Sequence, residues 1–77
     1  MDQINKAFGK VVRELRVLAG MSQEALGQEA GLQRNFISSI ELGAKQPSLG
    51  SVFKIAAALK ISAGDLLALV EANMISK

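Results

Sequence analysis

Apolar residues recur along the first part of the chain at the spacing of an amphipathic helix. Between positions 4 and 15 they fall at i, i+4, i+7, i+8 and i+11, which places them on one helical face. The residues are Ile4, Phe8, Val11, Val12 and Leu15. Gly20 follows as a left-handed C-terminal cap. The pattern therefore predicts one helix with a single buried stripe that ends before this glycine.

A second and a third helix are predicted to follow, with a very short turn between them. Ser22 is a good N-cap for the second helix, and Gly31 stops it. Only residues 31–33 separate it from the third helix, which is expected over about 34–42. A turn this short that contains glycine is typical of a helix-turn-helix unit. The sequence places this unit at about 22–42.

Two more helices are predicted in the C-terminal half. Ser48 caps the fourth, which is expected to bury Leu49, Val52, Phe53, Ala56 and Leu59. Ser62 opens the fifth, over about 62–75, and an acidic residue three positions later makes a near capping box. Its apolar stripe is Leu66, Leu69, Val70 and Met74. No strand pattern of useful length is present, so the 77 residues are predicted to form one compact all-α domain of five helices.

A series of short motifs runs through most of the chain. They are Leu15-Arg16, the run GMSQEAL at 20–26, Ala30-Gly31-Leu32, Ile37-Ser38, Ile40-Glu41, Pro47-Ser48-Leu49 and Ile55-Ala56-Ala57-Ala58-Leu59. Their order and spacing resemble the Cro/repressor-like (Xre) family of helix-turn-helix regulators, and within it the short controller proteins of restriction–modification systems. The resemblance covers about residues 7–67. It implies a lambda-repressor-like fold that binds double-stranded DNA.

The third predicted helix carries side chains suited to reading bases in the major groove. Arg34 can bond guanine and Asn35 can bond adenine, each through two hydrogen bonds. Ser38 and Ser39 lie four residues beyond them on the same faces. The resemblance implies that Arg34, Asn35 and Ser39 occupy base-reading positions of the family. The alternative is an ordinary solvated helix face.

Other polar residues are expected at the DNA backbone. Ser22 and Gln23 begin the second helix, where free backbone N–H groups favour an anion. The resemblance implies that Gln23 contacts a phosphate and braces the recognition helix. Lys45 and Gln46 follow the third helix and are placed for the backbone too, although any loop lysine gives this pattern. Phe36 either packs between helices, which we favour, or reaches a sugar or a thymine methyl group.

The resemblance also pairs Arg16 with Glu41 in a partly buried salt bridge that would hold the recognition helix in place. The alternative is two exposed charges that contribute little to stability. Several positions depart from the family pattern, and two of them bear on the helix-turn-helix itself. Gln33 is a poor N-cap for the third helix. Gly27 permits close helix approach at a cost of about 0.5–1 kcal/mol.

Composition favours a homodimer. Hydrophobic residues make up 49% of the chain, and the net charge is only +2. The last helix has more apolar residues than a five-helix core needs, and the expected interface is Leu67, Leu69, Val70 and Met74. The alternative is that all of them pack against the first helix. One recognition helix also reads too few base pairs to select a site in a genome, which favours a two-fold dimer on a pseudo-palindrome.

Composition also excludes several functions. The chain has no Cys and no His, which excludes thiol and imidazole chemistry, and no glycine-rich phosphate loop follows a strand. We therefore expect no enzymatic activity, no cofactor and no metal. The apolar runs are too short to span a bilayer, and the lack of cysteine fits a cytoplasmic protein.

The predicted function is transcriptional regulation, as a repressor or activator of the controller or phage type. The alternative is an antitoxin or another interaction module, which exposed Val17, Leu18 and Met21 would favour. Its protein partner would be a toxin, and RNA polymerase is the other protein contact to consider.

Overall fold

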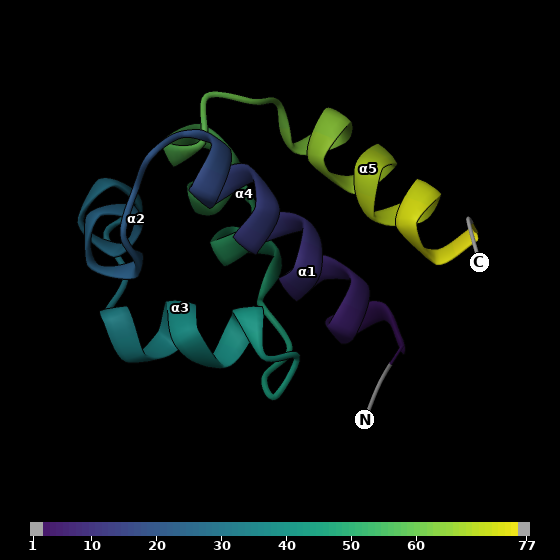
Figure 1. Cartoon of the computed structure of the whole chain (residues 1–77), viewed down its shortest axis with the longest axis horizontal. Coiled ribbons are helices and arrows are strands. Elements are labelled where there is room, and N and C mark those ends of the chain that lie inside the picture. The colour runs from purple at the N-terminus through teal and green to yellow at the C-terminus, as the bar shows by residue number, and fades with distance from the viewer. Residues whose placement is uncertain (1–2, 76–77) are drawn as a thin grey trace.

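The computed structural model describes residues 3–75, which form five α-helices (Figure 1). They are α1 (Gln3–Leu18), α2 (Gln23–Ala30), α3 (Arg34–Glu41), α4 (Leu49–Ala58) and α5 (Ala63–Ile75). Helix α1 packs against α3 and α5, α2 packs against α3 and α4, and α4 packs against α5. In Figure 1, α3 and α5 lie at opposite edges of the molecule. The predicted five-helix, all-α architecture is confirmed.

Local cap chemistry defines most helix ends. Three helices follow a serine whose hydroxyl accepts a hydrogen bond from the backbone N–H three residues later, over 2.9–3.1 Å. These serines are Ser22, Ser48 and Ser62. After three helices the chain turns at a glycine with a left-handed φ of 70–73°. These glycines are Gly20, Gly31 and Gly43. The helix boundaries are therefore set by residues that satisfy the free groups at helix ends.

The core receives fully buried side chains from all five helices. They are Val12, Leu26, Ile37, Ile40, Ile55 and Leu66. The predicted stripe of α1 is buried at Phe8, Val11 and Val12 and half-buried at Leu15, whereas Ile4 is 56% exposed. The first turn of α1 thus extends past the core.

The buried face of α4 differs from the prediction. Val52 and Ala56 are buried as expected, but Leu49 is 70% exposed and Phe53 59% exposed. Ile55, on the other side of the helix, is fully buried instead. Almost every position of α4 is apolar, so the sequence pattern does not reveal which face turns inward. Two large hydrophobic side chains consequently lie on the surface.

Helices α1 and α3 approach each other closely at Gly9. A Cβ atom at this position would lie 2.2 Å from the carbonyl oxygen of Ile40 and 2.7 Å from that of Glu41. Both are backbone atoms, so they cannot move aside unless α3 shifts as a whole. Gly9 therefore sets the distance between α1 and the C-terminal end of α3, a role that the sequence analysis did not assign.

We expect Gly9→Ala to lower the free energy of unfolding by about 2–3 kcal/mol, because the added methyl group overpacks the contact with α3. Urea unfolding followed by circular dichroism measures this change. Gly64→Ala is the matched control, since its Cβ would meet nothing closer than 3.9 Å. This helical position should gain up to about 1 kcal/mol from alanine. Equal effects at both positions would contradict the assigned role of Gly9.

Candidate nucleic-acid interface

Helices α2 and α3 are joined by a turn that depends on two glycines. Gly31 has φ 70°, and its N–H donates to the carbonyl of Gln28 at 3.3 Å. The N–H of Leu32 donates to the carbonyl of Gly27 at 2.8 Å. A Cβ on Gly27 would lie 2.6 Å from the carbonyl oxygen of Leu32. The close approach expected at Gly27 is therefore made by the backbone of the turn itself.

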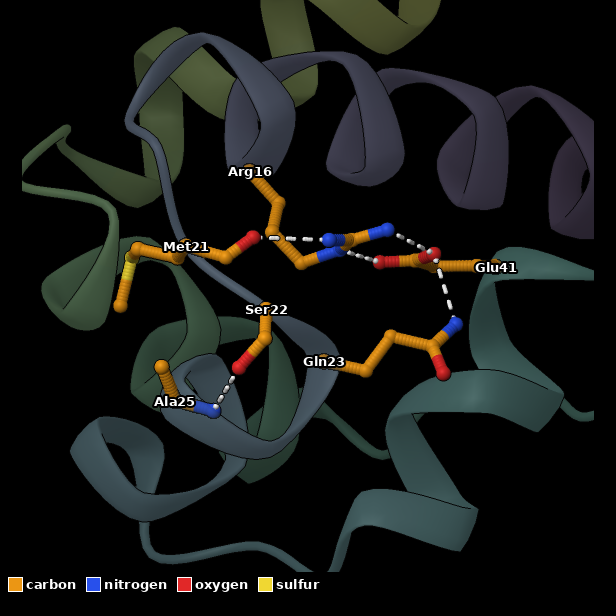
Figure 2. A network of polar contacts seen from close by, with 6 residues as sticks. All are labelled: Arg16, Met21, Ser22, Gln23, Ala25 and Glu41. Carbon is orange, nitrogen blue, oxygen red and sulfur yellow. Dashed lines mark hydrogen bonds and ion pairs between the residues drawn. The ribbon is translucent and has the colours of Figure 1, made fainter.

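Arg16 and Glu41 join α1 to α3 through a bidentate ion pair (Figure 2). The Nε of Arg16 donates to Oε2 of Glu41 at 2.6 Å, and Nη2 donates to Oε1 at 3.1 Å. The side chains are only 11% and 4% exposed. The hydrogen bond to Glu41 raises the pKa of Arg16 above its ordinary value, against the opposing effect of burial. The ion pair is present and partly buried, as the resemblance implied.

Two more hydrogen bonds extend this ion pair into a network across the helix-turn-helix (Figure 2). Gln23, at the start of α2, donates from Nε2 to Oε1 of Glu41 at 3.1 Å. Arg16 donates from Nη1 to the carbonyl of Met21 at 2.8 Å, immediately before the cap of α2. Glu41 is the last residue of α3, where the helix dipole disfavours a negative charge. The donors on α1 and α2 offset that effect and fix the C-terminal end of α3.

The outward face of α3 begins with two exposed side chains. Arg34 and Asn35 are exposed, and neither forms a hydrogen bond or ion pair with another residue of the described chain. Ser38 and Ser39 are half-buried. Gln33 precedes the helix without making a side-chain cap bond. The two long polar residues at the N-terminal end of α3 are thus free to meet a ligand, while the serines offer less surface.

The residues expected at phosphates keep donors available. Ser22 accepts from Ala25, which leaves its hydroxyl hydrogen uncommitted. Gln23 is half-buried and uses one amide hydrogen for Glu41, so the other remains. Lys45 and Gln46 are exposed in the loop after α3. Ser22 directly precedes α2, and Gln23 lies in its first turn. Lys45 and Gln46 follow α3.

The charge of this surface is positive. Between positions 34 and 48 the only acidic residue is Glu41, and its charge is paired with Arg16. Arg34 and Lys45 therefore face solvent without a neighbouring carboxylate on the same segment. Phe36 is half-buried against the core, which agrees with the packing role that we favoured. An anionic ligand at α3 would be attracted by Arg34 and Lys45, while the exposed carboxylates of the helix-turn-helix lie on α2, with Glu24 in its first turn.

The predicted interface residues of α5 do not form one exposed face. Val70 is only 5% exposed and belongs to the core of the single chain, so its assignment to a dimer interface is wrong. It lies four residues after fully buried Leu66 and points the same way. Met74 is half-buried and packs against the same core, whereas Leu67 and Leu69 are 43% and 42% exposed.

Leu67 and Leu69 line different grooves on the two flanks of α5. One groove, of about 180 Å³, runs beside Leu67 and is also lined by Ile4, Phe8, Pro47 and Val52. The other, of about 270 Å³, runs beside Leu69 and is also lined by Val11, Leu15, Leu18 and Ala72. The apolar surplus of α5 is therefore divided between two surfaces.

Residues 3–75 hold no group of three or more acidic, histidine or cysteine side chains placed to bind a metal ion. None of the helices in this part of the chain is both long enough and apolar enough to cross a membrane.

Comparison with known proteins gives consistent matches. The helix-turn-helix family HTH_3 matches residues 12–66. The control protein C.BamHI of Bacillus amyloliquefaciens is 42% identical over 67 residues, or 86% of this chain and 83% of that protein. The restriction–modification controller C.AhdI of Aeromonas hydrophila has a crystal structure with a TM-score of 0.78 and 39% identity, covering 80% of this chain and 94% of its own.

A third relative shares the fold at lower identity. The controller protein C.Esp1396I has been solved as a tetramer in complex with its natural 35 base-pair operator. Its structure matches with a TM-score of 0.91 at 22% identity and covers 99% of this chain and 100% of its own. The five-helix arrangement thus recurs almost unchanged.

We expect Arg16→Ala to lower the free energy of unfolding by about 3–5 kcal/mol, because it leaves the buried carboxylate of Glu41 without its counter-charge. Thermal and urea unfolding measure the loss. The double variant Arg16→Met/Glu41→Leu should recover most of it, since no buried charge is then unpaired. Arg13→Ala, on the exposed face of α1, should stay within about 0.5 kcal/mol. If Arg16→Ala leaves the free energy of unfolding unchanged, the ion pair does not contribute to stability.

Proposed function

Since this chain belongs to the HTH_3 helix-turn-helix family of DNA-binding regulators, we propose that it binds a pseudo-palindromic operator sequence-specifically, as a dimer, and regulates transcription. The observation that carries this proposal is the exposed pair Arg34 and Asn35 at the start of α3, which have no partner within the described chain. Their side chains suit guanine and adenine edges in the major groove. Ser38 and Ser39 lie one turn further along and would contribute shorter contacts.

The backbone of the DNA would be held on both sides of α3. The free N–H groups at the start of α2, the hydroxyl of Ser22 and the second amide hydrogen of Gln23 favour one phosphate. Lys45 and Gln46 would meet another beyond the end of α3. Gln23 donates one amide hydrogen to Glu41 of α3 and could donate the other to a phosphate at α2. One side chain would then link the bound phosphate to α3. Phosphate binding would thereby orient the recognition helix.

The dimer that we propose uses the surface between α4 and α5. Leu49 and Phe53 lie one turn apart on the outer side of α4 and are 70% and 59% exposed. Leu67 of α5 lines a groove with Val52, which directly precedes Phe53. Three large hydrophobic side chains on neighbouring helices are a costly surface for a monomer. Since α3 lies at the opposite edge from α5, this interface would leave it free for DNA (Figure 1).

The relatives suggest the biological setting. C.BamHI and C.AhdI are control proteins, the second explicitly of a restriction–modification system. We propose the same setting, a restriction–modification system, for this chain. A phage-type repressor is the alternative within the same class of regulator. Regulation would follow protein concentration, because both dimerisation and operator occupancy depend on it.

A second candidate function, binding to a protein partner as an antitoxin, is favoured by the end of α1. Val17 is 58% and Leu18 82% exposed, and Leu18 lines the groove beside Leu69. A toxin gene beside the gene for this chain would support it. A neighbouring methyltransferase or endonuclease gene would support the controller function instead.

We expect Arg34→Ala to lower the affinity for the operator by about 1–3 kcal/mol and to relax specificity at one base position, because a bidentate contact to guanine is lost. Gel shifts with the DNA upstream of its own gene, repeated over a salt series and with each base pair changed in turn, measure both effects. Gln23→Ala should instead weaken all sequences alike. Binding by the unaltered protein that ignores sequence would remove the regulator proposal.

We expect Phe53→Ser to convert the dimer into a monomer at micromolar concentration, because it removes a large apolar side chain from the centre of the proposed interface. Sedimentation velocity measures the change. Leu18→Ser, on the other apolar groove, is the control and should remain dimeric. A monomeric unaltered protein at this concentration, or dissociation by Leu18→Ser alone, would contradict the α4–α5 interface.

A further inference from the structure

Lys45 lies over the aromatic ring of Phe36. Its Nζ is 5.8 Å from the ring centroid, within the distance at which a cation is attracted to a π face. Lys45 itself is exposed, while Phe36 is half-buried and packs against the core. Within the described residues Lys45 has no ion pair, so its contact with the ring is the one that places its ammonium group.

The two partners come from different segments. Phe36 belongs to α3 and follows Asn35 directly, so its ring moves with the recognition helix. Lys45 belongs to the loop after α3, and its side chain makes no hydrogen bond within the described residues. The ring contact therefore ties a loop lysine to the position of α3.

The strength of this contact suits a positioning role. A cation–π contact at an exposed site is weak compared with the rotamer entropy that a free lysine side chain carries. The ring can bias where the ammonium group lies without competing with a phosphate for it. A lysine already held near its binding position loses less entropy when it binds.

We propose that Phe36 is a positioning residue for DNA binding: its ring holds the ammonium group of Lys45 beside α3, where it meets a phosphate at the edge of the groove that α3 enters. This inference rests on the proposed DNA-binding function. It gives Phe36 an indirect part in affinity, through Lys45. Direct contact between Phe36 and a thymine methyl group is the competing explanation.

A double-mutant cycle separates the two explanations. Operator affinity is measured over a salt series for the unaltered protein, Phe36→Leu, Lys45→Gln and the double variant. Lys45→Gln should reduce the salt slope by about one phosphate contact. Phe36→Leu should weaken binding by about two- to five-fold in the unaltered background and have no further effect once Lys45 is glutamine. Phe36→Tyr, which keeps an aromatic ring, should bind as the unaltered protein does.

Two results of this cycle would overturn the proposal. One is an equal loss from Phe36→Leu in both backgrounds, which would mean that Phe36 acts on DNA or on the fold directly. The other is a salt slope that Lys45→Gln leaves unchanged. If Phe36→Leu does not fold, as judged by circular dichroism, Lys45→Gln and Phe36→Tyr still decide the outcome through the salt slope and the retained affinity.

A measurement on the free protein keeps this test independent of the proposed function. Ring currents should shift the ε-methylene protons of Lys45 upfield in the NMR spectrum, and Phe36→Leu should abolish that shift. Identical Lys45 shifts in the two proteins would overturn the positioning role even if DNA binds. If the ring-current shift is present and no DNA is bound sequence-specifically, the DNA-binding proposal fails instead.

Discussion

The carboxylate of Glu41 is the point on which the arrangement of α1, α2 and α3 depends. It accepts two hydrogen bonds from Arg16 and one from Gln23, and it is almost completely buried. Gly9 makes this geometry attainable, because it lets the backbone at the end of α3 rest directly on α1. Arg16 lies seven residues after Gly9, two turns along the same face of α1. A close backbone contact and a buried ion pair thus act on the same end of α3.

A buried ion pair of this kind contributes little net stability, because desolvation of two charges offsets much of their attraction. Any packing of α3 that kept Glu41 buried without these donors would cost several kcal/mol. The short α3 has no side-chain cap at its N-terminus, so its position depends on contacts with the neighbouring helices. The hydrogen-bond network around Glu41 therefore fixes the position of α3, which its own capping residues do not define.

Much of the fold could be predicted from the sequence because its signals are local. Serine caps, left-handed glycines and the amphipathic patterns of α1 and α3 act within a few residues. The exposed face of α4 could not be predicted, since α4 is apolar around most of its circumference. The spacing of Val70 from Leu66 does indicate its inward side, but the many apolar residues of α5 obscured which of them were surplus to the core. The ion pair between Arg16 and Glu41 came from resemblance to a family.

The remaining features of the site are tertiary. Nothing in the sequence around Gly9 shows that a backbone approaches it, and a glycine within a helix is usually read as a cost. The contact of Lys45 with Phe36 spans nine residues and a loop, so no helical spacing predicts it. By contrast, Arg34 and Asn35 were identifiable as surface residues from their polar side chains, since the buried residues of α3 are the isoleucines Ile37 and Ile40.

The isolation of Arg34 and Asn35 from the rest of the protein has an evolutionary consequence. Neither side chain makes a hydrogen bond or ion pair that the described fold depends on, so substitutions there carry little penalty in folding free energy. Under the proposed function, a duplicated copy of the gene could drift toward a new operator at these two positions while Gly9, Arg16 and Glu41 stay fixed. Two paralogous regulators in one cell could then cease to bind each other's operators through substitutions at a few exposed positions. Neither would need changes in the residues that stabilise its fold.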